Sequence, residues 1–213
     1  MKWPGKFWWI GLVTIIALGA ILVVYNPAPV AASFDFDDGT VQGWSFDGVY
    51  DDAGKKTNGA LFPQSMLTNV NNELVFFPDQ LGLGLKQAGF SATSEYWRVD
   101  LVSPALGPAW KGLTGIEFDV RDQVGLVDNG LEVLPFIRYA AGGQTVEVPA
   151  QAPFTPTLQH DSWTTVSEVI PLPAGATPLA IVLRIRGRWA TPGSPVIAAY
   201  EGQVYVDDVT KIN

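Results

Sequence analysis

The 213-residue chain contains no cysteine and only one histidine. Without cysteine there can be no disulfide, no thiolate metal site and no cysteine nucleophile. The lone His160 has no second histidine for a paired metal motif, and no G-x-S-x-G sequence offers a serine nucleophile for it to activate. Phosphate-binding loops and dinucleotide fingerprints are missing as well. The common catalytic arrangements therefore have no basis in this sequence, which predicts that the protein is not an enzyme.

Positive charge is also scarce. The chain has 13 Lys and Arg against 21 Asp and Glu, which gives a formal net charge of −8 at pH 7. Nucleic-acid phosphates and anionic lipid headgroups are both bound by clustered basic residues. The charge balance therefore argues against a nucleic-acid partner and against a domain that lies flat on anionic lipid.

Turn residues and short alternating segments are abundant. Glycine occurs 22 times and proline 16 times. Residues 113–121 and 181–186 alternate apolar and polar side chains with the period of two that is typical of half-buried strands. Further strands are expected at residues 131–139, 163–171 and 203–210, which are rich in β-branched and aromatic residues. Because no capped amphipathic helix separates these segments, the sequence predicts an all-β fold, an antiparallel β-sandwich.

A long apolar run stands at the N-terminus. Residues 7–25 carry no charge, and as a helix they would extend roughly 28 Å, close to the thickness of a hydrocarbon core. Lys2 and Lys6 precede the run, so we expect residues 1–25 to form a cytoplasmic stub and a single-pass transmembrane signal anchor. Residues 26–33 would be a stiff Pro/Ala tether, and residues 34–213 a domain on the periplasmic or extracellular side. The alternative is a cleaved signal peptide that ends near Ala32.

Three segments carry a resemblance to a known group of folds. The opening segment, residues 34–44, reads FDFDDGTVQGW; residues 96–121 contain two strand-like stretches that end at Pro104 and Arg121; and residues 202–209 read GQVYVDDV. In this order they resemble the galactose-binding-like β-sandwich group, which includes carbohydrate-binding modules and the laminin-type domain IV. The resemblance implies a jelly-roll sandwich that binds glycans, docks to proteins or, occasionally, catalyses.

The same resemblance implies a structural calcium ion. In the group, the entry and closing strands lie side by side, and their carboxylates often share Ca²⁺. Asp37 matches the entry carboxylate and Asp207 the closing one, with Asp35 and carbonyl oxygens near Gly39 and Thr40 as further candidate ligands. The alternative is a solvated acidic edge next to an Asp-Gly turn.

The segment from Glu117 to Asp122 resembles the E-x-D-x-x-E motif of sandwich-fold glycoside hydrolases. A retaining glycosidase needs two carboxyl groups ~5–5.5 Å apart. In a regular strand, Glu117 and Asp119 share one face, whereas Asp122 falls on the opposite face. We therefore expect an ordinary strand with a polar outer face, and not a catalytic pair.

The remaining candidates form a basic, aromatic-edged surface. Alternation should place the arginines near residue 186 on one face of a strand, and two tryptophans are candidates for its rim; the predicted ligand- or partner-binding residues are Trp110, Trp189, Arg184, Arg186 and Arg188. The alternative for the arginines is ion pairing with nearby carboxylates. Trp44 and Trp163 are expected in the core.

Two non-catalytic functions are compatible with these features. The short tether and the lack of a catalytic segment in this sequence favour a docking or accessory subunit that contacts a protein in a membrane complex. The alternative is a carbohydrate-binding module at the cell surface. A sandwich-fold glycoside hydrolase is a second alternative.

Overall fold

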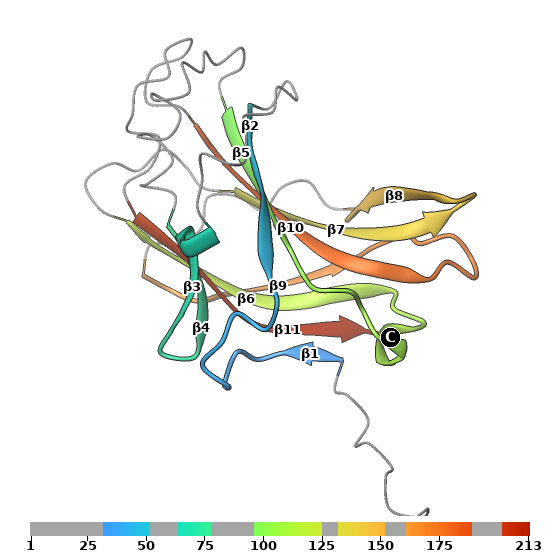
Figure 1. The fold of residues 1–213 in the computed structure, drawn as a ribbon, viewed down its shortest axis with the longest axis horizontal. Helices are drawn as coiled ribbons and strands as arrows, with labels where there is room; N and C mark the ends of the chain where they lie inside the picture. The colour runs from blue at the N-terminus through green and yellow to red at the C-terminus, as the bar shows by residue number, and fades with distance from the viewer. Residues whose placement is uncertain (1–31, 52–63, 78–95, 125–131, 152–160, 189–201) are drawn as a thin grey trace, which may run out of the picture. The chain divides into compact units, whose positions relative to one another are not determined.

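The computed structural model describes residues 32–51, 64–77, 96–124, 132–151, 161–188 and 202–213 (Figure 1). Ala32–Asn213 forms one compact unit. Within it, strands arrange in two layers, and every described pairing is antiparallel. The predicted all-β antiparallel sandwich is confirmed. The predicted anchor and most of the tether lie outside the described residues; within the described ranges, no helix has the length and apolar character to cross a membrane.

The first layer, sheet A, has β11 at its centre. The strand order is β3-β4-β11-β6-β9, and β1 pairs with the later part of β11. Its strands are β1 (Ser33–Phe34), β3 (Leu67–Val70), β4 (Glu73–Phe76), β6 (Gly115–Val124), β9 (Thr164–Val169) and β11 (Gly202–Ile212).

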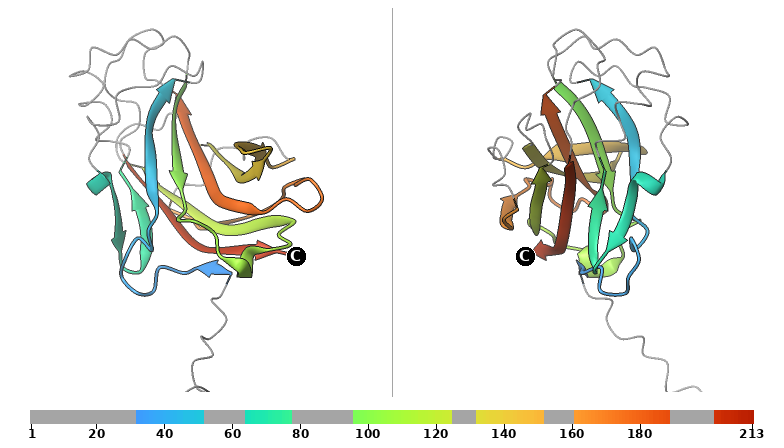
Figure 2. Two further views of the ribbon diagram at one scale, coloured as in Figure 1. Left: turned by 45° about the vertical axis from the view of Figure 1, so that its right-hand side comes forward. Right: turned by 90° about the vertical axis from the view of Figure 1, so that its left-hand side faces the viewer.

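The second layer, sheet B, has the order β2-β5-β10-β7-β8 (Figure 2). Its strands are β2 (Ser45–Asp51), β5 (Tyr96–Val102), β7 (Glu132–Ala141), β8 (Gln144–Pro149) and β10 (Pro178–Arg188). Two short 3-10 turns complete the described elements: η2 (Gln64–Met66) and η4 (Pro108–Trp110). The sequence therefore placed the strands at 113–121, 131–139, 163–171, 181–186 and 203–210 to within a few residues.

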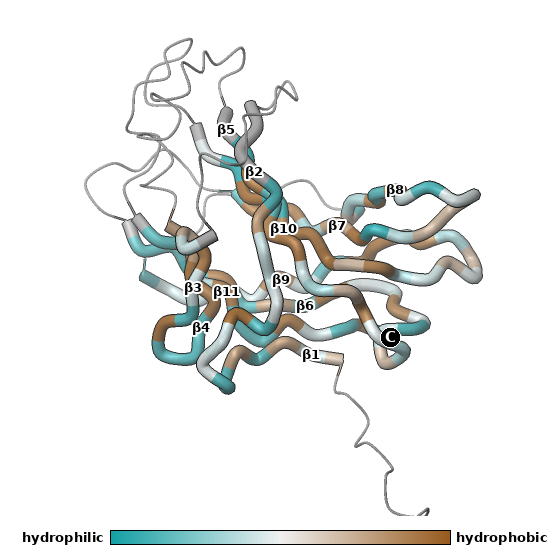
Figure 3. The backbone as a smooth tube through the Cα atoms, in the orientation of Figure 1, coloured by the Kyte–Doolittle hydropathy of each residue, from teal (hydrophilic) through white to brown (hydrophobic). Residues whose placement is uncertain are grey.

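The core lies between the two sheets and follows the alternation that the sequence shows. On β6, Ile116, Phe118 and Val120 are fully buried, and on β10 Ile181 and Leu183 are buried opposite them. Figure 3 shows the hydrophobic residues of β7 and β10 in brown. Each such side chain stabilises the fold by roughly 1.5–3 kcal/mol relative to an exposed one. On β6 the intervening Glu117, Asp119 and Arg121 are polar and lie on the outer face, whereas the intervening Val182 of β10 is buried as well.

An aromatic cluster closes the sandwich at the N-terminal strand. The Phe34 ring lies 5.5 Å from the rings of both Trp44 and Trp110, and Phe36 lies 6.2 Å from Trp44, all measured between centroids. Trp44 and Trp110 are each 3% exposed. Trp44 is thus a core residue, as predicted. Trp110 is also in the core, so its prediction as a ligand-contacting rim residue is wrong: η4 turns the ring inward onto Phe34.

Trp163 departs from its prediction in the opposite direction. It directly precedes β9, and 40% of its surface is exposed, although a core position was expected. The residues of β9 that follow it at every second position, Thr165, Ser167 and Val169, are exposed as well. Trp163 therefore belongs to the outer face of sheet A.

Candidate functional site

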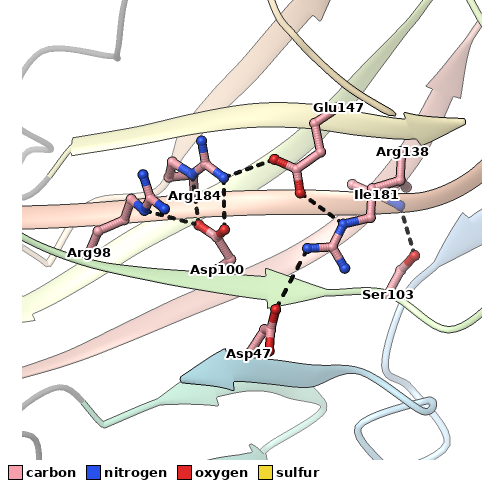
Figure 4. A network of polar contacts seen from close by, with 8 residues as sticks. All are labelled: Asp47, Arg98, Asp100, Ser103, Arg138, Glu147, Ile181 and Arg184. Carbon is pink, nitrogen blue, oxygen red and sulfur yellow. Dashed lines mark hydrogen bonds and ion pairs between the residues drawn. The ribbon is translucent and has the colours of Figure 1, made fainter. Parts of the chain in front are cut away.

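A network of arginines and carboxylates covers the outer face of sheet B (Figure 4). It arises from strand register. Because β5 and β10 bury Leu101 and Leu183 toward the core, the adjacent Asp100 and Arg184 point outward, and the register sets them directly opposite each other. We call the eight charged residues of this face the sheet B network: Asp47, Arg98, Asp100, Glu132, Arg138, Glu147, Arg184 and Arg186.

Arg184 is at the centre of the network. Its Nε and Nη2 atoms donate to the two carboxylate oxygens of Asp100 at 2.7 and 2.8 Å, and Nη2 also donates to Glu147 Oε2 at 3.0 Å. The guanidinium carbon lies 4.1 Å from the ring centroid of Phe136 on the neighbouring strand β7. Two carboxylates and one aromatic face therefore hold the guanidinium in a fixed orientation.

Arg138 and Glu147 extend the network across β7 and β8. Arg138 Nε donates to Glu147 Oε1 at 2.8 Å, and Arg138 Nη2 lies 3.9 Å from Asp47 on β2, although β5 and β10 lie between those two strands in the sheet order. Arg98 pairs with Asp100 at 3.9 Å, and Arg186 donates to Glu132. All five strands of sheet B therefore contribute charged side chains to these ion pairs.

Ionisation of the network is fixed by its own contacts. Burial opposes the charged form of Glu147, but the hydrogen bond from Arg138 and the charges of Arg184 and Arg138 outweigh burial and lower the pKa of this carboxyl. Burial likewise opposes the charge on Arg184, yet hydrogen bonding and attraction to Asp100 raise its pKa. The contacts of Glu147 and Arg184 therefore favour the charged form of both side chains.

Access to solvent increases from the centre of the network toward its edge. The side chain of Asp100 is 4% exposed and that of Arg184 is 13% exposed, whereas Glu147 reaches 30% and Asp47 47%. Four arginines and four carboxylates balance in charge. The face thus offers a ligand many oriented hydrogen-bonding groups and almost no net charge.

The arginines predicted from sequence are distributed as alternation requires. Arg184 and Arg186 lie on the same face of β10, as predicted, and both are ion-paired, which was the stated alternative to a free basic surface. Arg188 ends β10, but its side chain, like Trp189, lies outside the described residues. Sequence analysis missed Asp100, Arg138 and Glu147; alternation marks all three as outward-facing, but their register against β10 is not visible in the sequence.

The predicted calcium ligands come from two segments: Asp35 and Asp37 follow β1, and Asp207 lies on the central strand β11, where the charge of Asp37 acts on it. Asp35 Oδ1 accepts a hydrogen bond from Gln42 at 3.0 Å, and the carbonyl oxygens of Phe36 and Thr40 both accept from the Asn69 side-chain amide at 2.9 Å. Across the parts of the chain that the structure describes, no three acidic or histidine side chains come together as a metal site requires. Calcium at Asp35, Asp37 and Asp207 stays a prediction without support from this geometry.

Asp207 nevertheless has an unusual electrostatic environment. It lies on β11 beside a register shift, where Asp208 adopts a φ of 48°. Burial, together with the negative charges of Asp208, Glu73 and Asp37, raises its pKa to about 6, against the effect of a hydrogen bond from the Asp208 amide. A carboxylate with this pKa is destabilising when it is ionised in the folded protein.

This shift predicts a pH-dependent stability. Folded Asp207 binds its proton more tightly than unfolded Asp207, so its contribution is largest below pH 4 and is lost as the pH rises through about 6. Melting curves between pH 4 and 7.5, recorded with chelator, should show Asp207→Asn gaining on the parent as the pH rises. A difference in melting temperature between variant and parent that stays constant with pH would contradict the raised pKa of Asp207. Added calcium should raise the melting temperature of the parent alone if the ion binds Asp207.

The glycosidase alternative is tested by the faces of β6. Glu117 is exposed on the outer face of the strand, whereas Asp122 is fully buried toward the core. The two carboxyl groups therefore lie on opposite sides of the sheet, as the alternation of the strand predicts, and cannot flank one glycosidic bond.

No protein-family model and no curated protein matches the chain. Solved structures with a similar fold include a carbohydrate-binding module specific for non-crystalline cellulose, with a TM-score of 0.48 and 18% identity over 87% of this chain and 94% of that one. A carbohydrate-binding-module structure of the β-sandwich superfamily has a TM-score of 0.45 and 13% identity, over 84% of this chain and 61% of that one. A β-1,3-glucanase from Mycobacterium marinum has a TM-score of 0.41 and 13% identity, over 87% and 100% of the two chains. TM-scores below 0.5 at such low identity indicate no function for this chain.

Proposed function

We propose that the domain is a non-catalytic module that binds an uncharged glycan on the outer face of sheet B. The observation that carries this proposal is the sheet B network, in which guanidinium donors and carboxylate acceptors are held rigidly and remain partly open to solvent. Sugar hydroxyls both donate and accept hydrogen bonds, so they match a surface that presents fixed groups of both kinds. Because the groups are already oriented, binding loses little side-chain entropy.

The charge balance of the network selects the class of glycan. Every arginine of the network has a carboxylate partner, so an anionic sugar would have to displace one or approach it closely. Like charges brought together at such a distance are unfavourable. A neutral polysaccharide meets neither obstacle.

The protonation states favour binding over hydrolysis. A glycosidase needs one carboxyl whose pKa is raised so that it can protonate the leaving group. In the sheet B network, Glu147 has a lowered pKa and bonds two arginines, so it accepts hydrogen bonds but cannot supply a proton at neutral pH. A network of this kind can hold a sugar in place without cleaving it.

Docking to a protein in a membrane complex was the main prediction from sequence, and it is now the less favoured one. It relied on the tether, on the lack of a catalytic segment in this sequence and on a basic surface at Arg184, Arg186 and Arg188. Of these arginines, Arg184 and Arg186 are engaged by carboxylates of their own sheet. We retain from that prediction the proposal that residues 7–25 anchor the domain outside the cytoplasm, because Lys2 and Lys6 precede the apolar run. Polysaccharides are accessible on that side.

Arg138→Ala should weaken glycan binding at least about tenfold, equivalent to about 1.4 kcal/mol. Arg138 is 23% exposed and bridges Glu147 and Asp47, so its loss removes donors without opening the core. The full chain in non-ionic detergent would be titrated calorimetrically with cellohexaose, xylohexaose and mannohexaose. Lys111→Ala, an exposed cation outside the network, is the matched control and should bind as the parent does.

Two outcomes would contradict the proposal. If none of the three oligosaccharides binds, the docking function becomes the better account. If one binds and Arg138→Ala leaves its affinity unchanged, the domain binds glycan at another surface.

A further inference from the structure

The outer face of sheet A carries a stack of three side chains that the sheet B network does not involve. The guanidinium carbon of Arg121 lies 4.8 Å from the ring centroid of Trp163 and 4.2 Å from that of Tyr205. Arg121 Nη2 also donates to Glu73 Oε2 at 2.9 Å. We call Trp163, Arg121 and Tyr205 the Trp163 platform.

Strand register builds the platform. Tyr205 on β11 is the direct partner of Arg121 on β6, and Val120 is paired with Thr164, so Trp163 comes next to Arg121 on the other side. Glu73, on β4 beyond β11, anchors the guanidinium from the far side. Four neighbouring strands or their ends therefore hold the Trp163 ring against a fixed cation, so the ring is oriented before any ligand arrives.

Burial differs sharply within the platform. Tyr205 is 7% exposed and forms its base, whereas Trp163 is 40% exposed. Among the large hydrophobic residues that the described ranges leave exposed, which are Val70, Trp163, Val169 and Leu179, Trp163 is the aromatic one. A rigid, exposed indole next to polar groups is the arrangement that stacks on the apolar face of a sugar ring.

Polar groups surround the ring. The Tyr205 hydroxyl donates to Gln123 Oε1 at 2.8 Å and contacts the side chain of Gln203. Burial and the negative charges of Glu73 and Asp161 outweigh the attraction of Arg121 and raise the pKa of Tyr205, so this hydroxyl keeps its proton. The charge of Arg121 is already paired with Glu73, and the negative charges of Glu73 and Asp161 act on this part of the face. The surroundings suit hydroxyl donors and repel anionic groups.

We propose that the Trp163 platform is a second binding site for uncharged glycans, on the opposite side of the sandwich from the sheet B network. Trp163 stacks on one sugar ring, and the amides of Gln123 and Gln203 bond its hydroxyls. With one site on the outer face of each sheet, a single domain holds two polysaccharide chains at once. The inference goes beyond the proposed function, because it names a different surface with its own residues.

The test compares Trp163→Ala, Trp163→Phe and Val169→Ala in the full chain, each alone and combined with Arg138→Ala. Val169 is 52% exposed, lies at the end of β9, the strand that Trp163 precedes, and is outside the platform, so Val169→Ala is the matched control. Native electrophoresis in non-ionic detergent, through gels containing mixed-linkage β-glucan, xylan, glucomannan or the anionic polygalacturonate, measures the affinity for each polymer. Light scattering of the domain mixed with the retarding polymer measures cross-linking, which requires both sites.

We expect Trp163→Ala to lose at least about tenfold in affinity for one neutral polymer, or about 1.4 kcal/mol. Trp163→Phe, which keeps a ring, should lose less, and Val169→Ala nothing; polygalacturonate should retard no variant. Cross-linking should disappear in both Trp163→Ala and Arg138→Ala. If the melting temperature of Trp163→Ala is far below that of the parent, Gln123→Ala, a change at an exposed residue beside the platform, is tested in its place.

The inference is overturned if Trp163→Ala and Gln123→Ala are retarded like the parent in every gel, in both backgrounds. The two proposals fail separately. Retardation that depends on Arg138 but not on Trp163 supports the proposed function and contradicts a site at the Trp163 platform. Retardation that depends on Trp163 but not on Arg138 supports the platform and contradicts binding at the sheet B network. No retardation by any polymer removes both.

Discussion

Asp100→Ala should lower the free energy of unfolding by about 3–5 kcal/mol, the range found when one partner of a buried ion pair is removed. The side chain of Asp100 is 4% exposed and bonds Arg184 through both of its oxygens. Without it, Arg184 keeps its charge in a site that is 13% exposed, and Glu147 supplies a single remaining bond at 3.0 Å. The uncompensated charge is the reason for the large effect. Urea unfolding followed by circular dichroism measures it.

Two further variants separate the lost pair from a general loss of packing. Asp47→Ala removes a carboxylate that is 47% exposed and 3.9 Å from Arg138, so it should cost at most about 1 kcal/mol. Asp100→Leu combined with Arg184→Leu removes both charges and should be less destabilised than Asp100→Ala. If the double variant is the less stable one, the charge left on Arg184 is not the cause.

Gly115→Ala should destabilise the fold by about 3 kcal/mol, the upper part of the range for overpacking a close-packed site. A Cβ atom at Gly115 would lie 2.2 Å from the carbonyl oxygen of Glu168 and 3.2 Å from the Cα atom of Val169. Both neighbours are backbone atoms of β9, and Gly115 pairs directly with Val169. The hydrogen bond from Ile170 N to Thr114 O at 2.9 Å fixes the same spacing, so the strands must separate to admit the methyl group.

Gly107→Ala is the matched control. Within the described part of the chain, no atom beyond Gly107 and its two neighbours in sequence lies within 4 Å of the Cβ position at Gly107, and its φ of −80° is open to any residue. It should be neutral or stabilise by about 0.4–1 kcal/mol, because alanine restricts the unfolded chain. Thermal melting of both variants is sufficient. Equal melting temperatures would show that β9 yields to the added methyl group without cost.

Local pattern was sufficient to predict β6, β7, β9, β10 and β11 and the faces on which the charged side chains of β6 and β10 lie. Alternation is a property of the extended backbone itself, so the sequence assigns Arg184 and Arg186 to one face and Glu117 and Asp122 to opposite faces. Composition was equally informative. The absence of cysteine excludes disulfides and thiolate sites in any fold, and the scarcity of basic residues argues against nucleic-acid binding in any fold.

The positions of two tryptophans outside the strands were predicted wrongly. Trp110 was expected at a rim and is buried, and Trp163 was expected in the core and is exposed. Trp110 lies in the turn η4, where no period of two determines its side, whereas Trp163 directly precedes β9 and shares the exposed face of Thr165, Ser167 and Val169. Trp110 stacks on Phe34, which is far away in sequence, and is buried there. Trp163 contacts Arg121 on the outer face of sheet A.

The sequence alone therefore determined the fold class, the positions of β6, β7, β9, β10 and β11, and the absence of cysteine chemistry, since each follows from local periodicity or composition. Only the tertiary structure decided which charges meet. Asp100 reaches Arg184 because β5 pairs with β10, and Glu147 reaches the same guanidinium from β8, two strands away. Strand order and register result from packing the whole core, and no short segment of sequence encodes them. The two candidate glycan surfaces, one on each sheet, depend on that register for every contact.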